Sequence, residues 1–155
     1  MSSDYDYWIS VSNFTDVGIT PRVNCCNFPL NNDELNTITN SYASILNYIL
    51  EKSIVGPLPV VNHRGLLVLV FKFEIIDNDV KDKRIVSEGG KTIGLLTLFY
   101  KIKLDEIFKK LHKKILQQIT VWVKQYNNIR DINQVEITKL MDDINQIKVK
   151  QKIKH

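Results

Sequence analysis

The residues with the most reactive side chains are two cysteines and three histidines. Cys25 and Cys26 are adjacent, and the histidines are His63, His112 and His155. A thiol activated by a distant histidine is a common enzyme nucleophile, so spacing alone leaves open a dyad of either cysteine with His63. Neighbouring side chains of an extended strand point to opposite faces, which argues against a disulfide or metal site shared by the two thiols. We therefore expect a reducing, cytoplasmic environment, with a thiol enzyme as the third hypothesis for function.

Residues 87–92, with the sequence SEGGKT, end like a phosphate-binding P-loop. A P-loop needs a glycine five residues before its second glycine and a helix that begins at the lysine. Position 85 is isoleucine, and an apolar run typical of a strand follows Thr92. The sequence therefore predicts a glycine turn that enters a strand, and no nucleotide cofactor.

Three aspartates, Asp77, Asp79 and Asp82, lie in the polar stretch 77–91 and superficially suggest a calcium-binding loop. The glycine at the sixth position and the closing glutamate of such a loop are missing at the required offsets. None of the histidines has a second ligand at metal spacing on its own element. We therefore expect a solvated loop, and neither a metal nor another cofactor.

Positive charge is concentrated in the last third of the chain, although the net charge is only +4. Residues 101–155 contain thirteen basic and six acidic side chains, whereas residues 1–50 contain one arginine and five acidic side chains. Such a patch can attract an acidic protein, nucleic acid or an anionic membrane, but a solvated helix face that keeps the protein soluble is the simpler interpretation. The candidate basic interaction patch consists of Lys109, Lys110, Lys113, Lys114, Lys148, Lys150 and Lys152.

Length and composition indicate one globular domain. The chain has 155 residues, of which 44% are hydrophobic and 25% charged, which is an ordinary balance. It contains no apolar run long enough to span a membrane, and its acidic N-terminus lacks the apolar segment of a secretory signal. We expect a single domain over residues 1–148 and a lysine-rich flexible tail over residues 149–155.

Apolar and β-branched segments predict five strands, at residues 7–13, 19–28, 58–61, 66–76 and 92–100. Gly18 favours a hairpin turn at residues 16–18 between the first two strands. Pro21 cannot donate to a ladder, so the second strand either begins after Pro21 or lies at an edge. A second turn is expected at residues 62–65, with Gly65 in an unusual backbone conformation.

Spacing of about 3.6 residues predicts three helices. Asn31 and Glu34 form a capping box before the first helix, which Gly56-Pro57 should end. Its expected inward positions are Leu35, Ile38, Tyr42, Ile45, Leu46, Ile49 and Leu50.

A long helix over residues 104–126 carries Trp122 and Tyr126 on its apolar side, which favours core packing over stacking on nucleic acid. A last helix is expected from Val135 or Glu136 to about Ile147. The order β-β-α-β-β-β-α-α predicts an α+β fold with a single five-stranded, mostly antiparallel sheet.

Several phrases resemble those of longin-like and roadblock-like domains, in particular those of small archaeal proteins. They are residues 16–23 (DVGITPRV) and the following strand that ends in Phe28-Pro29, then residues 58–66 (LPVVNHRGL), and finally the strand 93–99 (IGLLTLF) after an acidic turn and a glycine loop. The resemblance covers residues 7–147 and implies a longin- or profilin-like sheet with one helix on one face and two on the other. The loop 77–91 and the lysine-rich tail depart from the pattern.

This family has no shared catalytic residues, so the resemblance implies a non-enzymatic interaction module. Its members typically dimerise and bind small Ras-like GTPases or membrane-trafficking complexes. The implied partners are therefore a small GTPase or trafficking protein and a second copy of the chain, in the cytoplasm or at a membrane periphery. The alternative, from the charges alone, is a binder of nucleic acid or an anionic membrane surface through the basic C-terminal helix and tail.

Overall fold

Five strands form one antiparallel sheet in the computed structural model, which describes residues 6–48, 54–60, 62–87 and 89–153. The strand order is β2-β1-β5-β4-β3, so β2 and β3 are the edge strands. Every neighbouring pair is antiparallel, which confirms the α+β class expected from the pattern. The strands are β1 (Tyr7–Thr15), β2 (Gly18–Asn24), β3 (Ile54–Val60), β4 (His63–Ile76) and β5 (Lys91–Lys101).

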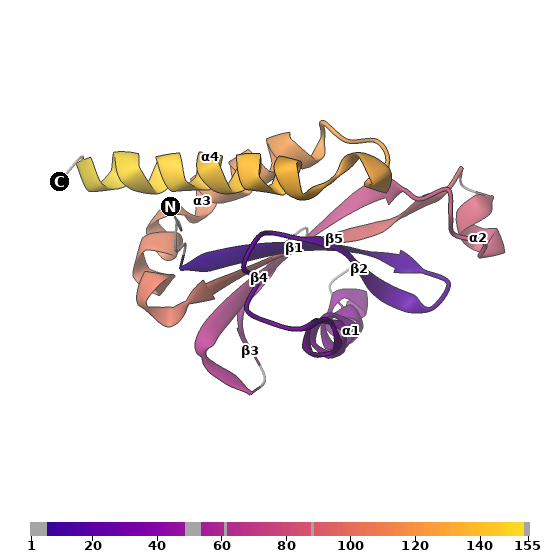
Figure 1. Cartoon of the computed structure of the whole chain (residues 1–155), viewed down its shortest axis with the longest axis horizontal. Helices are drawn as coiled ribbons and strands as arrows, with labels where there is room; N and C mark the ends of the chain where they lie inside the picture. The colour runs from indigo at the N-terminus through magenta and orange to yellow at the C-terminus, as the bar shows by residue number, and fades with distance from the viewer. Residues whose placement is uncertain (1–5, 49–53, 61, 88, 154–155) are drawn as a thin grey trace.

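Helices cover both faces of this sheet (Figure 1). The helix α1 (Asn32–Tyr48) packs on one face, and α3 (Asp105–Val123) lies with α4 (Gln134–Ile153) on the other. Two hydrophobic clusters follow from this arrangement, one between the sheet and α1 and one between the sheet and the α3–α4 pair. The short elements are α2 (Lys83–Val86), η1 (Ile102–Leu104) and η2 (Ile129–Asp131).

The predicted hairpin joins β1 to β2. Thr15 pairs with Gly18, whose φ of 98° lies in the region that glycine adopts without steric cost. Pro21 lies in β2, at the sheet edge, close to a register shift between Val11 and Ser12. Of the two options that the sequence left open, the second is therefore confirmed: the strand includes Pro21 and lies at the edge of the sheet. An edge strand tolerates a residue that cannot donate to the ladder.

The capping box at the start of α1 is confirmed. The Glu34 N–H donates to Asn31 Oδ1 at 2.8 Å, and the Asn31 N–H donates to Glu34 Oε1 at 3.3 Å. Leu35 and Ile38 are buried as expected. The side chains of the other expected inward positions, from Tyr42 to Leu50, lie outside the described residues.

Two boundaries around β3 differ from expectation. The predicted helix end at Gly56-Pro57 is wrong, because both residues lie inside β3, where the pairing with β4 shifts register between Val55 and Leu58. The expected turn at 62–65 is shorter than predicted, because β4 already begins at His63. Asn62, with φ 65°, takes the left-handed conformation that was assigned to Gly65, since asparagine tolerates this region better than most residues.

The last two helices bury one stripe each. Phe108, Leu111, Ile115, Ile119 and Trp122 of α3 are buried, which confirms the apolar spacing. Buried residues of α4 are Ile137, Leu140, Met141 and Ile144. The helix continues past the expected end at residue 147 as far as Ile153, so most of the predicted tail is helical here.

Candidate functional site

Four of the seven candidate lysines project from one side of α3. Lys109, Lys110, Lys113 and Lys114 are all exposed, and at 100° per residue they lie opposite the buried stripe of the helix. We call these four residues the α3 lysine face. Their positions follow from the amphipathic pattern alone, because packing the apolar stripe on the sheet turns the other side outward.

The first turn of α3 positions Lys109. Its Nζ lies 3.0 Å from Asp105 Oδ2, and Asp105 Oδ1 accepts a hydrogen bond from the Tyr100 hydroxyl at 2.9 Å. The bond from Lys109 and, to a smaller extent, the one from Tyr100 hold the pKa of Asp105 below its ordinary value, whereas burial raises the pKa of Tyr100. Among the described residues, no ion pair involves Lys110, Lys113 or Lys114. These three charges therefore face solvent uncompensated.

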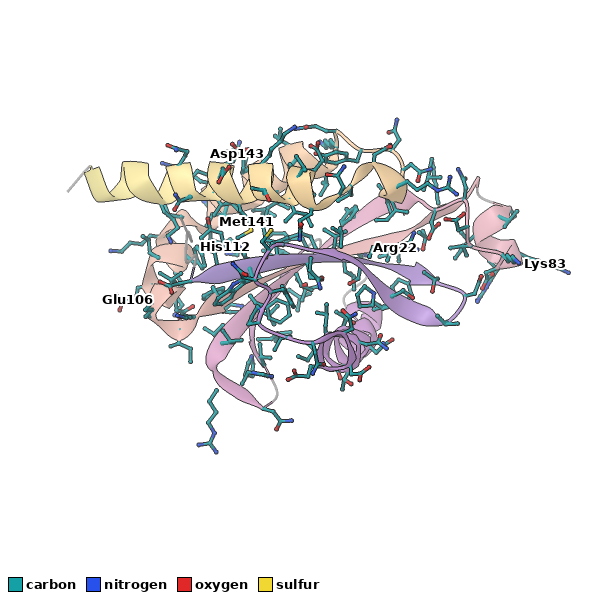
Figure 2. All side chains as sticks on the ribbon, viewed as in Figure 1. Arg22, Lys83, Glu106, His112, Met141 and Asp143 are labelled. Carbon is teal, nitrogen blue, oxygen red and sulfur yellow. The ribbon has the colours of Figure 1, made fainter. Side chains whose placement is uncertain are left out.

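Lys148 is placed differently from the α3 lysine face. Its Nζ lies 4.9 Å from the ring centroid of Tyr7 and 6.0 Å from that of Phe108, so the ammonium group contacts aromatic rings of the core. The Tyr7 hydroxyl in turn donates to the carbonyl oxygen of Met141 at 2.7 Å. Met141 points from α4 toward the sheet, in contrast to Asp143 (Figure 2). The side chains at the two remaining patch positions, 150 and 152, lie outside the described residues.

An open hollow of about 480 Å³ lies between the outer sides of α3 and α4. Its lining combines one cation, two amides and two aliphatic side chains: Lys114, Gln117, Gln118, Val121 and Ile147. Val121 is 54% exposed, which is unusual for a large aliphatic residue on this helix. Gln118 donates from Nε2 to Asp143 Oδ2 at 3.2 Å and joins the two helices across the hollow.

The geometry does not assemble a thiol–histidine dyad. Cys25 is buried in the cluster under α3 and α4, where burial raises the pKa of its thiol to about 11. His63 Nε2 instead lies 2.6 Å from Glu34 Oε2 of α1, on the opposite side of the sheet. Cys26 is exposed, and no hydrogen bond to it is present in the described parts of the chain. A thiol with this pKa is almost entirely protonated at neutral pH, so Cys25 is a core residue.

The P-loop-like segment forms a turn, as predicted. Gly89 and Gly90 have φ of 74° and 81°, and β5 begins at Lys91. A phosphate-binding loop would need a helix at this lysine. Residue 88 lies outside the described residues.

The expectation of a solvated aspartate loop at 77–91 is only partly correct. Asp82 caps the extra one-turn helix α2, and Asp79 forms an exposed ion pair with Arg130. Asp77, however, is 1% exposed. Asp16, at the tip of the β1–β2 hairpin, accepts hydrogen bonds from the backbone of Lys81 and residue 82, so it ties this loop to the hairpin. No group of three potential metal ligands occurs in the described segments.

Sequence reasoning missed a buried polar cluster around Asp77. Asp77 Oδ2 accepts from Asn13 Nδ2 at 2.8 Å and from Arg22 Nη1 at 3.3 Å, and Asp77 Oδ1 accepts from the Asp79 N–H at 3.0 Å. Asn13 is fully buried, and its Oδ1 has no partner among the described residues. The cluster fastens the end of β4 to the β1–β2 hairpin. The only local signal for this cluster in the sequence was the position of Asp77 directly after a strand of alternating apolar residues.

Two further hollows flank the N-terminal half of α1. One, of about 330 Å³, lies between α1 and the edge strand β2 and is lined by Pro21, Arg22, Val23, Asn24, Asn32, Asp33 and Asn36. The other, of about 250 Å³, lies toward the β3–β4 turn and is lined by Asp33, Glu34, Thr37, Ile38, Asn62 and His63. Both lie on the side of the sheet that α1 covers, away from the α3 lysine face.

Comparisons with protein-family models, with curated proteins and with solved structures give no match to this chain. In the described residues, none of the helices combines the length and apolarity required to cross a bilayer.

Proposed function

We propose that this chain is a non-enzymatic interaction module of longin- or roadblock-like type, and that it binds a small Ras-like GTPase or a membrane-trafficking protein. The observation that carries the proposal is the architecture. A five-stranded antiparallel sheet has one helix on one face and two on the other, in the element order that the resemblance implies. The two edge strands of such a sheet are natural sites for a protein partner.

The β2 edge and the adjoining side of α1 form the docking surface in this proposal. The other edge strand, β3, carries Pro57 and Pro59, which have no N–H to donate to an added strand. The strand β2 has only Pro21 and borders the polar hollow beside α1. Asp33 in that hollow offers an exposed charge for recognition, whereas the Arg22 guanidinium is paired with Asp77 at 3.3 Å.

A calorimetric titration of the full chain tests this proposal. The titrants are a panel of small Ras-like GTPases, each loaded with GDP or with a non-hydrolysable GTP analogue. We expect saturable binding to at least one of them, with a preference for one nucleotide state. Failure of every GTPase to bind in either state would overturn the proposal.

A pair of matched variants tests the surface. Asn36→Arg introduces a long charged side chain into the hollow beside β2 and should weaken binding about ten-fold or more. Gln117→Arg makes a similar change on α3, across the sheet, and should leave the affinity unchanged. Equal affinities of the Asn36→Arg variant and the original protein would rule out this surface.

Association of two copies is the second part of the proposal. Sedimentation of the chain, of 18.0 kDa, should give twice that mass if it dimerises as the resemblance implies. A monomer at all concentrations would contradict dimerisation and leave GTPase binding to be judged by calorimetry.

A further inference from the structure

We propose that the α3 lysine face docks on the surface of a bilayer that contains anionic phospholipids. This interaction uses the side of the molecule opposite the proposed protein-docking surface and does not depend on it. The lysines stand at positions i, i+1, i+4 and i+5, so four cations lie within about 8 Å along the helix axis. Lys124, which is also exposed, stands eleven residues after Lys113, about three turns, and therefore extends the same side.

Three of the four lysines of the α3 lysine face have no carboxylate partner in the described residues, which favours an external anionic partner. Exposed lysines that pair with a neighbouring carboxylate are partly neutralised, as Lys101 and Lys103 are by the Asp6 carboxylate that they share, at 3.0 and 2.9 Å. Lys110, Lys113 and Lys114 have no such pair in the described residues, and α3 carries no acidic residue after Glu106. The positive potential of this helix side is therefore directed at solvent.

The distribution of charge across the sheet orients the molecule. The helix α1 carries Asp33 and Glu34 and no basic residue, and it lies on the other face from α3 (Figure 1). A negatively charged plane attracts the α3 side and repels the α1 side. The protein should therefore approach such a plane with α3 first, which leaves α1 and the β2 edge accessible.

Aliphatic exposure beside the lysines favours a lipid surface over nucleic acid. Val121 is 54% exposed, and with Ile147 it lines the hollow next to Lys114. Lysines around an exposed aliphatic side chain are typical of an interfacial helix, whose apolar residues enter the boundary between headgroups and acyl chains. Proteins that bind single-stranded nucleic acid typically stack its bases on exposed aromatic rings, whereas Trp122 is 2% exposed and Tyr126 donates to Glu136 Oε2 at 2.6 Å.

Co-sedimentation of the full chain with vesicles tests the proposal. The vesicles contain phosphatidylcholine alone or phosphatidylcholine with phosphatidylserine. We expect binding only to the second kind, and a steep loss of binding as salt is raised, because the attraction is screened. Absence of binding to the phosphatidylserine vesicles at low salt would overturn the proposal.

Two triple variants with equal changes in net charge separate the α3 face from overall charge. Lys110→Glu/Lys113→Glu/Lys114→Glu alters the α3 lysine face, and each lysine lost should weaken binding by about five-fold or more. Arg64→Glu/Lys81→Glu/Lys83→Glu alters exposed residues elsewhere and should retain most of the binding. Equal losses in both would show that only net charge matters and would contradict a specific face. Circular dichroism of both variants verifies that each is folded.

Two further measurements decide the chemistry of the partner. Val121→Ser should weaken vesicle binding a few-fold without changing its dependence on salt, because it removes an apolar contact and no charge. A single-stranded oligonucleotide should bind more weakly than the phosphatidylserine vesicles at equal salt. Tighter binding of the oligonucleotide would contradict the proposal and indicate nucleic acid as the partner.

Discussion

Asn13 and Asp77, 64 positions apart in the sequence, are joined by a hydrogen bond of 2.8 Å inside the protein. Asn13 ends the buried part of β1, and Asp77 follows directly after β4, two strands away in the sheet. The Asp77 N–H also donates to the carbonyl oxygen of Gly90 at 2.8 Å, so one residue holds both the hairpin and the entry to β5. The cluster is a buried polar link between segments that are distant in the chain.

Removal of the Asp77 carboxylate should therefore destabilise the whole domain. Asp77→Ala leaves the Asp79 N–H without its acceptor and Asn13 Nδ2 with only the carbonyl oxygen of Phe14 at 3.2 Å, and we expect a loss of about 1–3 kcal/mol in the free energy of unfolding. Urea unfolding at neutral pH measures this loss. Asp79→Ala is the control, because the Asp79 side chain is 57% exposed and its ion pair should contribute at most about 1 kcal/mol. Similar losses in the two variants would contradict the role of the cluster.

Gly56 is a second position where substitution should be costly. Its φ is +120°, and a Cβ there would lie 2.6 Å from the carbonyl oxygen of Val68 on the neighbouring strand. Gly56→Ala should destabilise the protein by about 1–3 kcal/mol, because the backbone of β3 or β4 must shift. Gly65→Ala in β4 is the matched control. A Cβ at that position meets no atom within 4 Å, so the change should stay within about 0.5 kcal/mol.

Glu34 should make stability depend on pH in the acidic range. Its hydrogen bonds with His63 and with the Asn31 N–H hold the pKa of Glu34 below the ordinary 4.5. A lowered pKa in the folded state means that the stabilising contribution is present above pH 4.5 and is lost as the pH falls through the lower value. The stability difference between the original protein and Glu34→Gln should therefore shrink as the pH falls through the acidic range.

Urea unfolding of both proteins over a pH series measures this difference. Asp33→Asn serves as the control, because the Asp33 side chain makes no hydrogen bond in the described residues. A stability difference between the original protein and Glu34→Gln that grows as the pH falls would contradict a lowered pKa of Glu34 in the folded protein.

The two adjacent thiols should react at very different rates. Burial raises the pKa of Cys25 to about 11, so about one Cys25 thiol in ten thousand is ionised at pH 7, whereas Cys26 is exposed. Iodoacetamide should therefore modify Cys26 in the folded protein and reach Cys25 only in denaturant, as followed by mass spectrometry. Cys26→Ser should abolish the fast modification. Fast labelling of Cys25 in that variant would revive the thiol-enzyme hypothesis.

The sequence alone determined the features that depend on residues only a few positions apart. The spacing of Phe108, Leu111 and Ile115 predicted α3, and Asn31 with Glu34 predicted the start of α1, because helix periodicity and capping act over three or four residues. Gly18 predicted the hairpin turn for the same reason. The outward direction of the α3 lysine face follows directly from that periodicity.

Contacts between distant segments were decided only by the tertiary structure. The start of β3 at Ile54 depends on its pairing with Phe71 of β4, and the burial of Asp77 depends on the approach of Asn13 and Arg22. The position of Lys148 over Tyr7 likewise requires α4 to lie across the first strand. None of these contacts has a local signature, because the free energy of pairing or burying a side chain is set by its partners in space, and chain folding alone brings them together.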